Sequence, residues 1–215
     1  MGSGIMQYRG HRSGLSTVMF GSLASLHLVA GCAKPGQVSV SPEAAAGQAI
    51  SLYDANSDGA IDAEEAASCP PLASSIRSYD ADGDGRLASD EIANRLTQLF
   101  DSSSNLTEVS LTAMLDGRPL SGATVRLRPV DFLADVTPTA EGETDDAGVA
   151  RPTIGDELLP DDFRGLPLVQ HGLYYVEITH ASQQLAERYN SASELGFEVD
   201  PTSRSGTTAR FELTR

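Results

Sequence analysis

Apolar residues recur at helical spacing between residues 42 and 104, with two strongly acidic runs between the helical stretches. The first stretch, 42–54, opens with Pro and Glu, which suit the first turn of a helix. Pro70-Pro71 must end one helix and leaves room for the next over about 72–79. The last stretch, 91–100, carries one apolar stripe. The pattern predicts short helices that flank both acidic runs.

After residue 105 the pattern changes to short runs in which apolar and polar residues alternate. Tyr174, Val176 and Ile178 illustrate this, because every second side chain of a strand points to the same face. The predicted strands are 108–115, 123–130, 147–154, 173–179, 195–199 and 207–213, with a seventh near 135–139. The expected fold class is multidomain, α then β: a compact helical pair at 42–104 and an antiparallel β-sandwich of about seven strands at 105–215.

Residues 1–31 combine two arginines with a mostly apolar run, which is typical of a secretory signal peptide. A transmembrane anchor is the alternative, but the run of about 16 residues falls short of the ~20 needed to span a bilayer. Val29-Ala30-Gly31 before Cys32 resembles the lipobox of bacterial lipoproteins. The resemblance implies cleavage and lipidation at Cys32, hence a secreted, extracytoplasmic lipoprotein anchored to a membrane of the bacterial cell envelope. Residues 32–41 would form a flexible tether.

The two acidic runs, 54–65 and 80–91, are twelve-residue repeats that start 26 residues apart. Each places oxygen-bearing side chains at positions 1, 3, 5 and 12, and Gly at position 6. A calcium ion takes six to eight oxygen ligands, and a short loop supplies them only around a tight glycine turn. This spacing is that of the EF-hand calcium loop. We call 54–65 loop one and 80–91 loop two.

Both loops offer a full set of oxygen ligands. The expected ligands are Asp54, Asn56, Asp58, the carbonyl of Ala60, Asp62 and Glu65 in loop one, and Asp80, Asp82, Asp84, the carbonyl of Arg86 and Glu91 in loop two. Position 9 of loop two is Ala88, so a water molecule would fill that place. The expected cofactors are two calcium ions. The alternative is a pair of acidic turns that bind no metal.

Ile61 and Leu87 both stand at position 8 of their loops. In paired EF-hands, which these loops resemble, the position 8 residues meet through a short β-bridge, so we expect residues 42–104 to form an EF-hand pair. A calmodulin-type sensor exposes a Met-rich groove when calcium binds. The segment 42–104 contains no Met. We therefore expect structural calcium.

Three turns of the β region carry a further resemblance. The segments 116–125 (DGRPLSGATV), 144–150 (TDDAGVA) and 172–178 (GLYYVEI) resemble carboxypeptidase-regulatory-like and transthyretin-like β-sandwich domains. The resemblance implies a fold and an accessory role, and no activity.

Acidic residues outnumber basic ones by 30 to 15, which gives a formal net charge of −15. Loss of residues 1–31 removes Arg9 and Arg12 and no acid, so the mature chain would carry −17. Nucleic acid is excluded as a partner by this charge, and membrane contact is expected through lipidated Cys32 alone. Cys69 would then be the one free thiol, and we expect it to be a packing residue.

Catalysis is not expected. His171 and His180 lie nine residues apart with no Ser or Cys motif beside them, and we expect both to be isolated surface residues. We predict an accessory or interaction protein with an unknown protein or polysaccharide partner. One alternative is a dockerin-like docking module, although dockerin repeats usually end the loop with Asp and lack an incoming helix. The other is an accessory domain of a surface hydrolase system.

Overall fold

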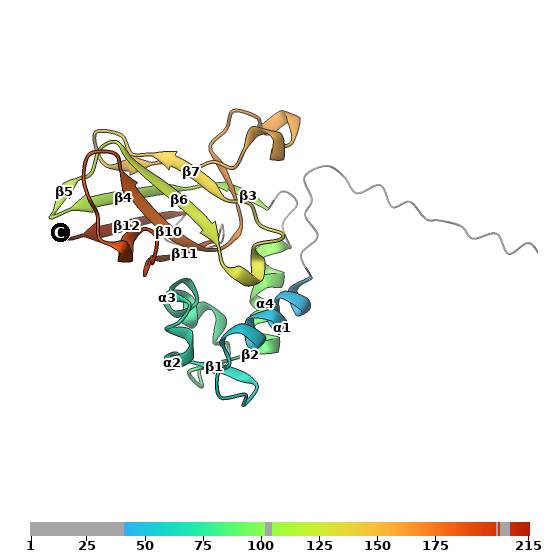
Figure 1. The fold of residues 1–215 in the computed structure, drawn as a ribbon. Helices are drawn as coiled ribbons and strands as arrows, with labels where there is room; N and C mark the ends of the chain where they lie inside the picture. The colour runs from blue at the N-terminus through green and yellow to red at the C-terminus, as the bar shows by residue number, and fades with distance from the viewer. Residues whose placement is uncertain (1–40, 102–104, 201, 203–206) are drawn as a thin grey trace, which may run out of the picture. The chain divides into compact units, whose positions relative to one another are not determined.

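The computed structural model describes residues 41–101, 105–200, 202 and 207–215, which belong to one compact unit (Figure 1). The signal peptide, Cys32 and all of the tether except Ser41 lie outside the described residues. Among the residues described, no helix is both long enough and apolar enough to cross a membrane. The domain boundaries at 31, 41 and 104 stay predictions.

Four short helices flank the two acidic loops. They are α1 (Pro42–Tyr53), α2 (Ala63–Ala66), α3 (Pro70–Tyr79) and α4 (Ser89–Phe100). The Ser41 hydroxyl accepts the Ala44 N–H at the start of α1, where Pro42 needs no partner for a missing N–H. Because Pro70 and Pro71 suit only the first turn of a helix, they begin α3 and leave α2 with four residues.

The two loops are joined by a short antiparallel ladder between β1 (Ala60–Asp62) and β2 (Arg86–Ala88). Ile61 lies opposite Leu87, as the position 8 pairing predicted. Both side chains are 0 % exposed, and their neighbours in each strand are only partly buried. The ladder therefore anchors both loops in the core by one side chain each.

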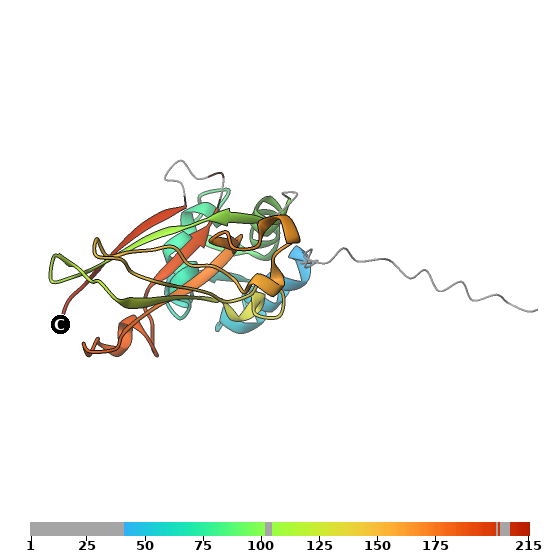
Figure 2. The same ribbon diagram turned by 90° about the horizontal axis from the view of Figure 1, so that it is seen from above.

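The remaining strands form three small sheets. The first contains β11 (Gly196–Val199), β10 (Gly172–His180), β6 (Ala123–Pro129) and β7 (Ala140–Glu143), in that order. The second contains β12 (Thr208–Leu213), β4 (Ser110–Leu115) and β5 (Arg118–Pro119), with β8 (Val149–Ala150) also paired to β4. The third pairs β3 (Leu106–Glu108) with β9 (Leu168–Gln170). Apolar residues of the first two sheets share one core, so these sheets pack face to face (Figures 1 and 2).

Single-turn 3-10 helices occupy several of the connections between strands. They are η1 (Asp131–Leu133), η2 (Asp156–Leu158), η3 (Asp161–Phe163) and η4 (Glu187–Tyr189). The seventh strand predicted near 135–139 is absent, because the chain turns there after η1. The next strand along the chain is β7, which begins at Ala140.

The predicted fold class is wrong. The described residues form mostly β-strands in several small sheets with only four short helices, and no compact helical pair stands before an antiparallel β-sandwich. The helices lack the apolar surface for a separate core, since the buried residues of α1 are three alanines and α2 has a single turn. The strands are not all antiparallel either, because β12 runs parallel to β4 along its whole length.

One hydrophobic cluster joins the helices to the β region. Besides Ile61 and Leu87 it contains buried side chains of α1, α3 and α4, and it continues into η1 and β10. Its members outside the helices include Leu133 of η1 and Leu173 and Tyr175 of β10. Burial of a side chain of this size contributes about 1.5–3 kcal/mol. The buried side chains of the helices thus share one core with those of η1 and β10.

A buried charge cluster fixes α4 to β11. Arg95 donates to Glu198 through Nε at 3.2 Å and Nη2 at 2.6 Å, and to Asp200 through Nη2 at 2.7 Å. These three side chains are only 10–11 % exposed. Burial disfavours the guanidinium, but the two carboxylates outweigh it and hold the pKa of Arg95 above its usual value. Burial raises the pKa of Glu198 despite Arg95.

Replacement of Arg95 tests how strongly this cluster holds the unit together. Arg95→Met would leave two buried carboxylates without their cation, so we expect unfolding free energy, measured by urea titration, to fall by about 3–5 kcal/mol. Arg118→Met removes an exposed arginine of β5 and should change stability by less than about 0.5 kcal/mol. Equal, small losses in both variants would show that the cluster does not fix α4 to β11.

Candidate metal centre

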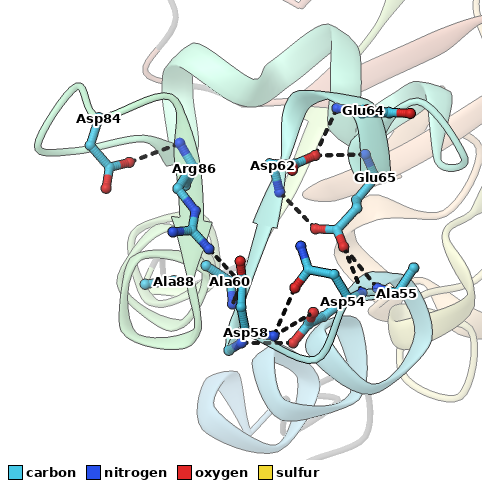
Figure 3. Close-up of polar contacts among 12 residues, drawn as sticks. Asp54, Ala55, Asp58, Ala60, Asp62, Glu64, Glu65, Asp84, Arg86 and Ala88 are labelled. Atoms are coloured by element: carbon cyan, nitrogen blue, oxygen red, sulfur yellow. Dashed lines mark hydrogen bonds and ion pairs between the residues drawn. The ribbon is translucent and has the colours of Figure 1, made fainter.

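In loop one, the side-chain oxygens of the first two expected ligands accept hydrogen bonds from backbone N–H groups of the same loop (Figure 3). Asp54 caps α1, and its carboxylate accepts the N–H groups of Asp58 at 3.2 Å and Gly59 at 2.9 Å. The Asn56 side-chain oxygen accepts the same Asp58 N–H at 2.8 Å. Because one N–H contacts both side chains, the oxygens of Asp54 and Asn56 lie close together. The loop therefore gathers its acceptors at one point.

Glu65 closes loop one at its other end. Its Oε1 accepts the N–H groups of Ala55 at 2.9 Å and Asn56 at 3.0 Å, and its Oε2 accepts the Asp62 N–H at 3.0 Å. Asp62 in turn caps α2 by accepting the N–H groups of Glu64 and Glu65 with Oδ1 (Figure 3). The twelfth residue is thereby held next to both the start of the loop and its ninth residue.

Loop two repeats this arrangement in its first half. Asp80 accepts the N–H groups of Gly83 at 2.7 Å and Gly85 at 3.0 Å, and Asp82 accepts that of Asp84 at 3.0 Å. The carboxylates of Asp80, Asp82 and Asp84 each offer an oxygen within 4.8 Å of the others. Three carboxylates at this separation repel one another, which disfavours the loop in the absence of a cation.

Glu91 plays the role of Glu65 in loop two. Its Oε1 accepts the Ala81 N–H at 2.8 Å and its Oε2 accepts the Ala88 N–H at 2.9 Å. The two residues expected to ligate by carbonyl, Ala60 and Arg86, are the first residues of β1 and β2. Among the described residues, Asp80, Asp82 and Asp84 are the one group of three acidic side chains with ligand atoms within 4.8 Å of one another. The all-oxygen donor set of each loop fits a hard divalent cation such as calcium.

Backbone conformation explains the glycine at position 6. Gly59 has φ of +92° and Gly85 has φ of +83°, in the left-handed region that disfavours residues with a Cβ atom. Position 4 also has positive φ, with Ser57 at +61° in loop one and Gly83 at +78° in loop two. Loop one therefore holds one strained residue that loop two avoids.

Both loops enter from aromatic residues that are packed against the β region. The Tyr53 ring, just before Asp54, meets Phe132 of η1 edge to face, with 6.3 Å between ring centroids. Tyr79, just before Asp80, is 1 % exposed, and burial, followed by the nearby Glu198 carboxylate, raises its pKa well above the usual value. The first ligand of each loop thus directly follows an anchored side chain.

The loops differ in one ionic contact. The guanidinium of Arg86, at position 7 of loop two, reaches Asp58 at position 5 of loop one (Figure 3). Sequence reasoning assigned only the Arg86 carbonyl a role. The contact could have been suspected from the predicted pairing of Ile61 with Leu87, because an antiparallel ladder in that register places Arg86 opposite Asp62 and so beside loop one. No sequence pattern indicated the cluster of Arg95 with Glu198 and Asp200, since 103 and 105 residues separate Arg95 from these two acids.

The other residues considered for chemistry are Cys69 and the two histidines, none of which is an expected ligand. Cys69 is fully buried, and burial raises the pKa of its thiol, which suits a packing residue. His171 is buried, contrary to the surface position expected, and its Nδ1 lies 2.8 Å from the Leu99 carbonyl oxygen. His180 is at the far end of β10 and contacts Ser121. The two histidines therefore form no pair.

Comparison with protein-family models, with curated proteins and with solved structures finds no match for this chain. The chemistry of the loops therefore has to be argued from their own residues.

Two glycine substitutions test the loop conformation. Gly85→Ala would place a Cβ atom at φ of +83°, so we expect it to lower the unfolding free energy by about 1–2 kcal/mol. Gly47 lies inside α1 with open space around its Cβ position, so Gly47→Ala should raise stability by about 0.5–1 kcal/mol. Urea unfolding of both variants measures the difference, and a neutral Gly85→Ala would contradict the left-handed turn at position 6.

Proposed function

We propose that this protein binds two calcium ions, one in each loop, and that the ions serve to hold a fixed shape. The observation that carries the proposal is the repetition of one hydrogen-bond pattern in both loops. Side-chain oxygens of positions 1, 3 and 5 accept the N–H groups of positions 6, 5 and 7, and the glutamate at position 12 accepts those of positions 2 and 9. Six oxygen donors in a loop of irregular geometry suit calcium, whereas magnesium demands a near-ideal octahedron and retains water.

A structural role is supported by what lies beneath the loops. Ile61 and Leu87 belong to the same buried cluster as Leu173 and Tyr175 of β10, so movement of either loop would disturb a core that extends beyond the helices. Arg95 also ties α4 to β11. The cluster contains no methionine among the described residues, whereas calcium sensors open on a Met-rich surface.

The cellular location belongs to the same proposal, but it rests on the sequence alone. The lipobox-like residues before Cys32 support a lipid-anchored, extracytoplasmic protein of the bacterial cell envelope. The same proposal includes an accessory or interaction role with a protein or polysaccharide partner. Calcium would then stabilise the folded domain that binds this partner.

Calcium calorimetry with matched variants tests the proposal. We expect two ions per chain for the unaltered protein and one for Asp54→Ala or Asp80→Ala, because each variant loses the first ligand of one loop. Asp90→Ala also removes one negative charge from loop two, but Asp90 stands at position 11, is exposed and lies outside the ligand set. It should retain two ions.

Absence of binding heat in the unaltered protein would contradict the proposal. So would equal losses in Asp80→Ala and Asp90→Ala, because that result would indicate general charge attraction in place of a defined site.

A further inference from the structure

The two loops are unequal in the structure because of one side chain. Position 7 is Ala60 in loop one and Arg86 in loop two. The Arg86 guanidinium forms an ion pair with Asp58, a ligand expected in loop one, and Ala60 has no side chain that could reach Asp84 in return. The contact therefore runs in one direction, from loop two into loop one (Figure 3).

The ion pair engages a carboxylate that is an expected calcium ligand. The Oδ1 atom of Asp58 that pairs with the Arg86 guanidinium also accepts the Ala60 N–H at 3.2 Å. Both contacts therefore hold the Asp58 carboxylate through the same oxygen. A guanidinium and a divalent cation on one carboxylate repel each other. Binding in loop one must therefore either displace Arg86 or proceed against its charge.

The size of this effect follows from exposure. The side chains of Arg86 and Asp58 are 41 % and 43 % exposed, so solvent screens the pair. Exposed pairs of this kind change an equilibrium by between about 1.4-fold and fivefold. Arg86 can thus shift the balance between the loops but cannot abolish binding.

We propose that Arg86 is a built-in competitor for loop one: it holds Asp58 when metal is absent and lowers the calcium affinity of loop one. The inference rests on the proposed calcium binding and adds a regulating residue to it. Among the described residues no basic side chain pairs with a carboxylate ligand of loop two, so the competition acts on loop one alone. Calcium enters loop one as Arg86 releases Asp58.

Arg86→Gln tests the competitor, because it keeps most of the side-chain length and removes the charge. In an Asp80→Ala background, where loop one alone can bind, we expect calcium affinity measured by calorimetry to rise between about 1.4-fold and fivefold. In an Asp54→Ala background, where loop two alone can bind, we expect a much smaller change. Arg77→Gln is the matched control, since Arg77 is exposed and lies three residues before Asp80.

A second readout uses the metal-free protein. There Arg86→Gln loses the ion pair, so in excess chelator the melting temperature should fall by up to about 4 °C. In saturating calcium the same substitution should leave the melting temperature unchanged or raise it. This change of direction with calcium is specific to a competitor, because a purely structural residue would lower stability under both conditions.

The outcomes separate the two proposals. If the Asp80→Ala protein takes up no calcium, calcium binding by loop one is wrong and the competitor fails with it. If it binds calcium and Arg86→Gln leaves the affinity unchanged, or raises affinity equally in both backgrounds, only the competitor is overturned.

Discussion

The contact of Ile61 with Leu87 is the constraint on which both loops depend. These residues face each other across a three-residue ladder and are fully buried in a cluster shared by the helices, η1 and β10. The other 22 residues of the two loops are exposed or only partly buried, and ten of them are Asp or Glu. An acidic loop that repels itself stays in one conformation only if something anchors it, and here the anchor is apolar and lies at position 8.

This arrangement links metal chemistry to folding. The carboxylates of Asp80, Asp82 and Asp84 lie close together, with Asp82 and Asp84 exposed, whereas Leu87 of the same loop is buried in the core. A cation between the carboxylates would remove their repulsion and so stabilise the ladder, while the ladder holds the carboxylates at binding distance. Tyr53 on Phe132 and Arg95 on Glu198 extend the same coupling from the helices into the β region.

Local features of the structure could be predicted from the sequence, and long-range features could not. The helices at 42–53 and 89–100, the ladder at Ile61 and six of the strand segments follow from periodicity, proline positions and loop spacing. The direction of β12 does not, because alternation predicts a strand without saying which neighbour it will join. The core shared by the helices and the β region could not be predicted either. It forms because the short helices bury little apolar surface against one another, which periodicity does not reveal.

Within the candidate site the same division holds. The ligand pattern is encoded locally, at fixed positions of each twelve-residue loop. The ion pair of Arg86 with Asp58 and the buried cluster around Arg95 depend on pairings between distant segments. The errors in fold class therefore come from the contacts between segments that the periodic patterns do not specify.

Hydrogen exchange of the β10 segment Gly172–Tyr175, followed in excess calcium and then in excess chelator, tests the central claim most directly. If calcium holds a core shared by the loops and β10, removal of calcium should speed exchange at Leu173 and Tyr175 as well as at Ile61 and Leu87. Faster exchange confined to the loops, with β10 unchanged, would contradict the account.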